Sequence, residues 1–570
     1  MGILNLTNPI KKIINLIKLE KKEISSIYFY AIMNGGLQLM MPIGIQGIVN
    51  FVLGGAFSTS LFLMIAFVVL TVFFNGLVQV NQMKIIEKIQ QKIFVRYAFS
   101  YAYRIPKLDL KTVDNFYLPE LLNRFFDTMT LQKGISKILL DIPTAALQIL
   151  IGLILLSFYH PVFIVFGGFL IILVTIILLF TANSGLATSM QTSSYKYAVA
   201  GWLEELARCV KSFKFSKHSL FHLKKTDHLI SKYLHWKTKH FQVLKLQYSI
   251  IIVFKVLITA IMLIVGSILL VDQQLNIGQF IAVEIVIILV LNSVEKLIAT
   301  LDKVYDVLTS VEKLGTLIEQ PLEKDGNNLI EDKDQGLRVN VNNLSFSYND
   351  TDVVLKNINF NVEASEKIGI VGFKNSGKTT LLRVLSGAFS EFNGSVMIDD
   401  LPINNYSLES FHSHVGILYS NHEIFYGTLE ENITMGFPIT NASLITNLIS
   451  ELGFDDMLIS LPDGLETKLE PVGKKLTRNF RNRILILRAL IGKPRLLLLY
   501  DDPWVKFEKS TRDKIVQYLF EKCSNTTIFL VSNESEILQQ CDKVLVLNEG
   551  NSIHFGPFTE LKNELNDFIK

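Results

Sequence analysis

Residues 367–382, KIGIVGFKNSGKTTLL, decide the fold of the second part of the chain. A run of apolar β-forming residues leads into this stretch and ends at Val371, and an apolar helical pattern follows from Thr380 onward. Between them, Gly372 to Thr379 satisfies the pattern G-x-x-x-x-G-K-[ST]. Because strand, loop and helix occur in the order that this motif requires, we interpret the stretch as a phosphate-binding loop and not as a glycine-rich turn.

The residues of this loop have distinct expected roles. Consecutive backbone N–H groups would surround a phosphate chain at the N-terminus of the helix. The Lys378 ammonium would reach the β- and γ-phosphates, and the Thr379 hydroxyl would ligate Mg²⁺. Asn375 and the two glycines can adopt the unusual backbone angles that such a loop needs. The residues expected to bind nucleotide here are Gly372, Asn375, Ser376, Gly377, Lys378, Thr379 and Thr380.

Composition indicates a membrane protein. The chain has 570 residues, of which 49% are hydrophobic and only 19% are charged, and its mean hydropathy is +0.36. The net charge of +3 arises from 55 basic and 52 acidic residues, which gives no large basic field and does not suggest a nucleic-acid partner. Cys209, Cys523 and Cys541 lack the spacing of a metal site, so we expect reduced, inert thiols.

Three long apolar stretches each have room for two membrane spans. Ile24 to Met83 and Ile142 to Tyr195 contain no charged residue, and Leu246 to Val294 contains three. Each stretch has a turn signal near its middle, at 54–60, 158–161 and 272–277. The sequence therefore predicts six spans.

The distribution of Lys and Arg predicts the orientation of these spans. The three short turns contain no Lys or Arg, whereas residues 84–140 contain ten and residues 196–245 contain eleven. We therefore expect a multi-pass protein of the cell (inner) membrane, with both termini and both long connections in the cytosol. The long connections also read as helical, which would extend the spans below the membrane.

Residues 1–23 interleave apolar side chains with lysines instead of forming an uninterrupted apolar core, which argues against a secretory signal. The pattern is typical of an amphipathic helix that lies on the inner membrane surface in contact with lipid. Within the spans, Lys255 and Glu284 are costly in hydrocarbon. They can be read as lining a translocation path, or as an interhelical pair or snorkelling side chains.

A polar segment with Pro and Gly, residues 319–336, reads as a linker, and an α/β pattern follows it. Expected strands outside the loop region are Leu337–Val341, Leu344–Tyr348, Leu496–Leu499, Thr527–Ser532 and Lys543–Leu547. The predicted organisation is an interfacial helix at 1–23, a six-span all-α membrane domain at 24–318, the linker at 319–336 and an α/β phosphate-loop NTPase domain at 337–570.

Taken together, six spans, long cytosolic loops and a C-terminal phosphate-loop domain resemble an ATP-binding cassette (ABC) half-transporter of the exporter type over essentially the whole chain. The membrane half is similar to bacterial type I secretion and peptide exporters, chiefly at Pro42–Gln46 and Val52–Leu61. The resemblance implies that ATP and Mg²⁺ are the cofactors and that Tyr348, 24 residues before Gly372, stacks on adenine.

The sequence departs from the family pattern at four places. Ser420 stands where the family has a glutamine that senses the γ-phosphate, and Asn533 stands where it has a switch histidine. The signature Leu-Ser-Gly-Gly-Gln aligns with Leu476–Phe480, LTRNF, in which both glycines are replaced. The family's Asp-Glu pair aligns with Asp501 and Asp502.

In this alignment Asp501 binds the metal together with Thr379, and Asp502 is the catalytic base. The base would be one methylene shorter than the family's glutamate, and an error of about 1 Å in position can cost on the order of a hundredfold in rate. The register is open by one residue, because counting from Pro494 places the metal aspartate at Tyr500. We prefer Asp501 because Asp-Asp-Pro503 matches the usual acidic pair followed by a small residue or Pro.

Four departures together indicate a cassette that binds ATP more than it splits it, and they leave open whether the chain is an effective ATPase. It could export a substrate, such as a peptide or protein, with an ATP-splitting partner, or do so as a homodimer with slow hydrolysis. Alternatively, it could be a nucleotide-binding membrane scaffold or regulator that transports nothing. Six spans favour transport. All four changes lie in one chain, so an intact partner would leave them divided between the two nucleotide sites of a dimer, and this favours a heterodimer with a second ABC half-transporter.

Overall fold

The computed structural model describes residues 7–55, 59–113, 117–215, 220–348, 352–419, 423–438, 443–500, 507–565 and 568. The chain forms two compact units. The helical unit comprises Met1–Pro106 and Phe116–Gln320, and the α/β unit comprises Lys107–Asn115 and Pro321–Lys570.

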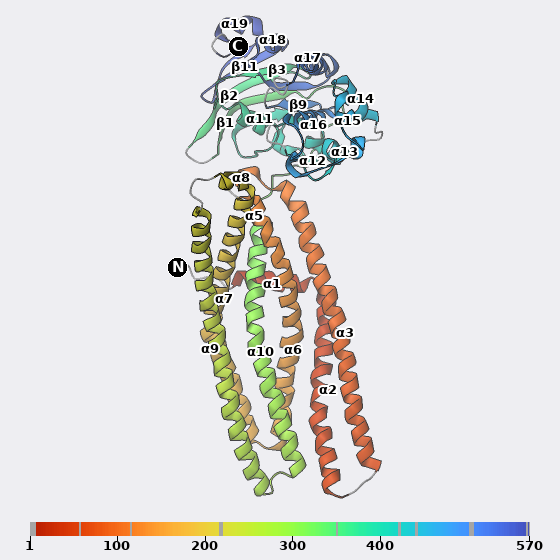
Figure 1. Cartoon of the computed structure of the whole chain (residues 1–570), viewed down its shortest axis with the longest axis vertical. Coiled ribbons are helices and arrows are strands. Elements are labelled where there is room, and N and C mark those ends of the chain that lie inside the picture. The colour runs from red at the N-terminus through yellow and green to blue at the C-terminus, as the bar shows by residue number, and fades with distance from the viewer. Residues whose placement is uncertain are drawn as a thin grey trace. The chain divides into compact units, whose positions relative to one another are not determined.

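The helical unit contains, within the described residues, six helices that are long and apolar enough to cross a membrane. In Figure 1 these helices lie alongside one another, and α1 (Thr7–Lys18) crosses their direction. The long helices are α2 (Lys21–Leu53), α3 (Thr59–Arg104), α6 (Asp127–Tyr159), α7 (Val162–Arg208), α9 (Phe221–Val271) and α10 (Ile277–Ile318). Shorter helical segments are η1 (Ile105–Lys107), α5 (Leu118–Asn123), η2 (Arg124–Phe126) and α8 (Val210–Lys214). The six predicted spans are therefore confirmed, and the three predicted turns separate them in pairs.

Close packing of α6 against α10 forms the centre of this unit. A Cβ atom at Gly152 of α6 would lie 2.6 Å from Val290 Cγ2 of α10, and one at Gly134 would lie 2.3 Å from Val307 Cγ2. Small residues let helix backbones approach closely where lipid supplies no hydrophobic drive between helices. As a result α10 is buried along much of its length, whereas helix faces away from this contact expose large apolar side chains such as Phe180.

The two charged residues predicted inside spans behave differently. Lys255 of α9 donates to Glu295 Oε2 of α10 at 2.9 Å and to Asn292 Oδ1 at 2.9 Å. It therefore forms an interhelical ion pair, which is one of the two interpretations that the sequence left open. Glu284 Oε1 is buried and has no hydrogen-bond partner among the described residues.

The α/β unit is built on a six-stranded sheet with the order β12-β11-β3-β10-β9-β6. The five strands from β11 to β6 are parallel, and β12 is antiparallel to β11. These strands are β3 (Lys367–Val371), β6 (Val415–Leu418), β9 (Leu496–Leu499), β10 (Thr527–Val531), β11 (Lys543–Asn548) and β12 (Asn551–Gly556). The central strands β3, β9 and β10 read as apolar runs because they are covered on both faces.

A second, antiparallel sheet has the order β2-β1-β4-β5, and β7 pairs with β8. Its strands are β1 (Val339–Ser347), β2 (Val353–Val362), β4 (Asn393–Ile398) and β5 (Leu401–Pro402), and the short pair is β7 (Gly427–Thr428) and β8 (Lys468–Leu469). The two strands predicted at 337–341 and 344–348 are a single strand, β1. The prediction of a break was wrong because Asn343 adopts φ 50°, which bends the strand as an irregularity without ending it.

Helices flank these sheets in the α/β unit (Figure 1). The helices of this unit are α4 (Leu110–Val113), α11 (Lys378–Leu385), α12 (Leu408–Ser413), α13 (Leu429–Thr434), α14 (Ser443–Glu451), α15 (Asp455–Ile459), α16 (Arg478–Leu490), α17 (Lys509–Gln517), α18 (Ser535–Leu538) and α19 (Phe558–Leu565). Residues 107–115 join this unit through a short antiparallel bridge between Leu108 and Leu322. Asp109 N donates to Pro321 O at 3.2 Å, and Glu323 N donates to Lys107 O at 2.9 Å.

Candidate functional site

One edge of the large sheet collects several of the residues that the sequence singled out. Parallel strands present their carboxyl ends at the same edge. Val531 of β10 lies beside Ile370 of β3, and Leu499 of β9 lies beside Leu418 of β6. The segments that follow these strands therefore emerge side by side: the phosphate loop after β3, Asn533 after β10, Tyr500 after β9 and Tyr419 after β6.

The phosphate loop has the backbone that its motif predicts. Asn375 has φ 66°, and Gly377, which caps α11, has φ 99°. Gly372 is required by space, because a Cβ atom there would lie 2.2 Å from Leu547 O. The loop therefore turns tightly between β3 and α11 and leaves a cradle at a helix N-terminus, a geometry that fits a phosphate chain.

Lys378, the first residue of α11, closes this loop on itself. Its Nζ atom donates to Gly372 O at 2.7 Å, to Phe373 O at 2.7 Å and to Ser376 Oγ at 3.3 Å. Burial lowers the pKa of this ammonium. Thr379 is exposed, so its hydroxyl is accessible to a metal ion, whereas Ser376 and Thr380 are buried.

Tyr348 follows β1 and lies beside the first turn of α11. Its hydroxyl is 3.2 Å from Thr380 Oγ1. Its ring packs edge-on against Phe346 and Phe389, with centroid distances of 5.1 and 5.5 Å. The structure thus brings the predicted adenine-stacking residue next to the predicted phosphate loop.

A cluster of one arginine and two tyrosines, Arg383, Tyr419 and Tyr500, lies beside α11, and sequence reasoning had named only Tyr500, as the alternative position of the metal aspartate. The guanidinium of Arg383 hydrogen-bonds to the Tyr419 hydroxyl and lies 5.1 Å from the centre of that ring. The Tyr419 and Tyr500 rings meet edge-on at 4.9 Å, and the Tyr500 hydroxyl donates to Ser386 Oγ at 3.3 Å. The sequence feature that could have revealed this cluster is the position of the two tyrosines: Tyr419 directly precedes Ser420, and Tyr500 directly precedes Asp501.

Residues Leu476–Phe480, which the sequence aligns with the family's signature, lead into α16 and form its start. The Thr477 side chain accepts a hydrogen bond from Phe480 N at 3.2 Å and thereby caps the helix. Arg478 and Asn479 are exposed in the first turn, which contains no acidic residue. Phe480 packs partly into the core of the α/β unit. Arg478 and Asn479 therefore place side chains beside the backbone N–H groups of this turn, where the two glycines of the family signature would place none.

Three predicted residues, Ser420, Asp501 and Asp502, lie outside the described residues. Asn533 is exposed after β10. Within the described part of the chain, no three His, Cys, Asp or Glu side chains form a cluster that could hold a metal ion by themselves. A Mg²⁺ ion at this edge would be held by the Thr379 hydroxyl, by the phosphates of the nucleotide and by Asp501, which the sequence predicts as a metal ligand and which lies outside the described residues.

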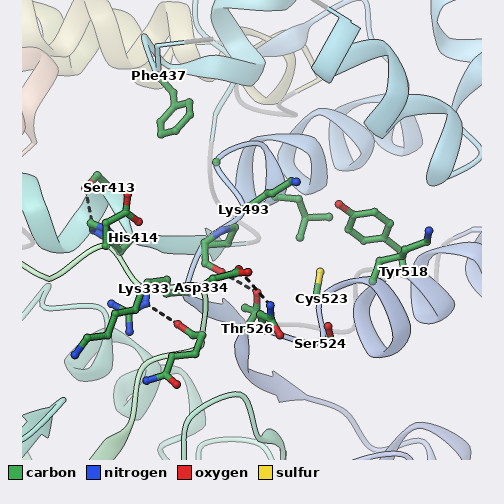
Figure 2. A pocket seen from close by; sticks show the side chains of 18 residues that line it. Lys333, Asp334, Ser413, His414, Phe437, Lys493, Tyr518, Cys523, Ser524 and Thr526 are labelled. Carbon is green, nitrogen blue, oxygen red and sulfur yellow. Dashed lines mark hydrogen bonds between the residues drawn. The ribbon is translucent and has the colours of Figure 1, made fainter. Parts of the chain in front are cut away.

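A cavity of about 570 Å³ in the same unit lies at the other end of the strands (Figure 2). Its lining includes Arg495 and Thr526, which directly precede β9 and β10, and Cys523. Burial raises the pKa of the Cys523 thiol to about 11, consistent with the inert thiol that the sequence predicts. Since nucleotides bind at the carboxyl ends of parallel strands, this cavity is distinct from the candidate nucleotide site.

Comparisons with known proteins agree with this architecture. The sequence matches the family described as "ABC transporter" over residues 355–505 and the "ABC transporter transmembrane region" over residues 25–294. The chain belongs to the ABC exporter family. Among solved structures, a bacterial Atm1-family ABC exporter with ATP bound matches with a TM-score of 0.82 at 17% identity, covering 95% of this chain and 96% of that one, which shows the shared fold.

Several curated proteins are similar to this ABC exporter. Over 304 residues it is 26% identical to the uncharacterized ABC transporter ATP-binding protein YknV of Bacillus subtilis, covering 53% of this chain and 50% of that protein. Over 297 residues it is 26% identical to the leukotoxin export ATP-binding protein LtxB of Aggregatibacter actinomycetemcomitans, covering 52% and 42%. The chain spans about half, or less, of the length of these relatives. The chain carries one transmembrane region and one nucleotide-binding region, which is the domain content of an ABC half-transporter, and half-transporters of this family dimerise.

Proposed function

We propose that this chain is the nucleotide-retaining subunit of a heterodimeric exporter. It would bind Mg·ATP through the phosphate loop, with Lys378 on the phosphates, Thr379 on the metal and Tyr348 on the base. The observation that carries the proposal is the contrast between two sites of the same unit. The phosphate loop has the required backbone geometry, whereas the signature turn presents Arg478 and Asn479.

In a heterodimer with an intact partner, the four departures from the family pattern would be divided between two nucleotide sites. In cassette dimers each nucleotide lies between the phosphate loop of one chain and the signature turn of the other. With an intact partner, one site would combine this chain's phosphate loop, its Asp501, Asp502, Ser420 and Asn533, and a sound signature. That site should hold ATP. The second site would combine the partner's hydrolytic residues with Arg478 and Asn479, and turnover should come from it.

We further propose that the exporter lies in the cell (inner) membrane with both termini in the cytosol, and that its substrate is a peptide or protein. The Lys and Arg distribution supports the orientation. Similarity to a leukotoxin export protein and to an alpha-hemolysin translocation protein, the latter at 26% identity over 297 residues, supports the class of substrate.

The test compares ATP turnover and ATP retention of the purified chain alone and with a co-expressed intact half-transporter. We expect ATP to remain bound in both preparations and turnover to rise sharply only with the partner. Vigorous turnover by the chain alone, abolished by Asp502→Asn, would overturn the proposal. Tight ATP binding without transport, in either preparation, would instead identify a nucleotide-binding membrane scaffold or regulator.

A further inference from the structure

A polar cavity of about 320 Å³ lies in the helical unit, among α2, α3, α6 and α10. Uncharged hydrogen-bonding side chains dominate its wall, and each lies near the middle of its long helix. They are Asn34, Gln38, Gln79, Thr144, Gln148, Asn292 and Ser293. Polar groups at such positions of apolar helices are expensive, and their concentration around one cavity indicates a function.

A chain of amide groups crosses three helices at this cavity. Gln38 Nε2 donates to Asn34 Oδ1 at 2.8 Å within α2. Gln148 Nε2 of α6 donates to Gln38 Oε1, and Ser293 Oγ of α10 donates to Gln148 Oε1 at 2.7 Å. These contacts fix the amides in place, and each amide has capacity for further hydrogen bonds.

Thr144 supplies an independent sign of a ligand. Its side chain lines the cavity and is only 4% exposed, yet Oγ1 has no hydrogen-bond partner among the described residues. A buried hydroxyl without a partner costs free energy, and an apolar side chain of similar shape would avoid that cost. Since the Thr144 side chain lines the cavity, a molecule bound there would supply a partner for this hydroxyl after rotation of the side chain, because Oγ1 is covered in this structure.

Among the described residues that line the cavity, the one cation, Lys296, is already paired with a carboxylate. Lys296 Nζ lies 2.9 Å from Asp141 Oδ1, and Asp141 is buried. An isolated anion such as a lipid phosphate would find this ammonium already neutralised. The wall instead presents neutral donors and acceptors side by side.

We propose that this cavity binds the main chain of an extended, uncharged segment of the exported peptide. The inference rests on the proposed export function and names where and how the substrate is held. Every residue of a peptide carries one N–H donor and one C=O acceptor, apart from proline, which lacks the donor. Side-chain amides match both groups whatever the peptide sequence. The volume suits a short segment of the chain and excludes a folded protein.

The test uses the full-length protein in lipid nanodiscs, with its co-purified partner, and a defined probe. The probe is a blocked peptide of Gly, Ala and Ser that carries one benzoylphenylalanine, and photolabelled residues are mapped by mass spectrometry. We expect labels on α2, α6 and α10 around the cavity. Thr144→Val and Gln148→Leu should each reduce labelling at least fivefold, whereas the control Gln91→Leu, an exposed position on α3, should leave it unchanged.

Thr144→Val separates a ligand role from a structural one. If the hydroxyl served only packing, this variant would fold equally well or better and would label normally, which would overturn the proposal. Labels confined to other parts of the helical unit would also overturn it but leave peptide export standing. Absence of any peptide label, with a phospholipid analogue photolabelling the cavity instead, would reject both the site and the substrate class proposed for it.

Discussion

The Nζ atom of Lys378 donates a hydrogen bond of 2.7 Å to the carbonyl oxygen of Gly372, across the phosphate loop that both residues delimit. The cation is thus held by oxygen atoms of the loop where a nucleotide would offer phosphate oxygens. Phosphate oxygens carry more negative charge than carbonyl oxygens, so their bonds to the ammonium are stronger. We therefore expect phosphate oxygens of a bound nucleotide to replace the loop oxygens as acceptors for Lys378.

Lys378→Ala should weaken ATP binding about tenfold to a hundredfold, because a hydrogen bond to a charged group contributes about 1.5–3 kcal/mol. Fluorescent-nucleotide titration of the purified protein measures the effect. Lys374→Ala is the matched control, since this lysine is exposed in the same loop. Equal affinities of the two variants would contradict the assignment of Lys378.

Local patterns were sufficient to predict much of this fold. Six spans followed from apolar length and from turn residues, and each turn lies where it was predicted. The strand, loop and helix around Gly372 followed from a motif whose backbone requirements are local, and Asn375 and Gly377 indeed have positive φ.

Contacts between distant residues could not be predicted in the same way. Lys255 was recognised as costly, but its partner Glu295 could be named only once α9 and α10 were seen to pack. Tyr419 and Tyr500 meet because they follow β6 and β9, which are neighbours in the sheet, and strand order is not written in any one segment. Arg383 joins them from α11. The amide chain from Gln38 to Ser293 depends likewise on which helices adjoin.

Glu323 should make the stability of the α/β unit depend on pH. Burial, with a smaller contribution from the negative charge of Asp109, raises the pKa of this carboxyl to about 7 from an ordinary 4.5. Between pH 4.5 and pH 7 the folded state therefore keeps this carboxyl protonated, whereas the unfolded state has released the proton. The stabilisation is fully present below pH 4.5 and is lost as the pH rises through 7.

Glu323→Gln should remove this component of the pH dependence and stabilise the protein at pH 8 by about 1 kcal/mol, after allowance for solvent screening. Thermal unfolding of the detergent-solubilised protein at pH 5 and pH 8 measures it. Glu391→Gln serves as the control, because Glu391 is an exposed carboxylate of the same unit. An unchanged difference between the two pH values in Glu323→Gln would refute the prediction.

Single-cysteine labelling should test the orientation of the spans. In a chain whose Cys209, Cys523 and Cys541 have been replaced, a membrane-impermeant maleimide should label Gln273→Cys in intact cells, because this exposed turn between α9 and α10 is expected outside the cytosol. Lys374→Cys, in the phosphate loop, should react only after the cells are opened. Labelling of Lys374→Cys in sealed cells would invert the topology.

In the proposed heterodimer, the signature turn, Arg478–Phe480, should limit turnover at the site that this chain would complete for its partner. Arg478 and Asn479 occupy the first turn of α16 and are exposed, so replacing both by glycine changes the approach to the backbone N–H groups while the Thr477 cap and the packing of Phe480 remain. Loss of one preorganised donor to a developing negative charge costs an enzyme about a hundredfold or more, so even partial restoration should raise turnover roughly tenfold. The measurement is ATPase activity of the double variant Arg478→Gly, Asn479→Gly co-expressed with the partner.

The control is the double variant Lys474→Gly, Lys475→Gly. Both lysines are exposed shortly before the same helix, and replacing them by glycine adds the same flexibility to the backbone. An increase with the control pair as large as with the signature pair would show that flexibility, and not access to the helix N-terminus, determines the rate.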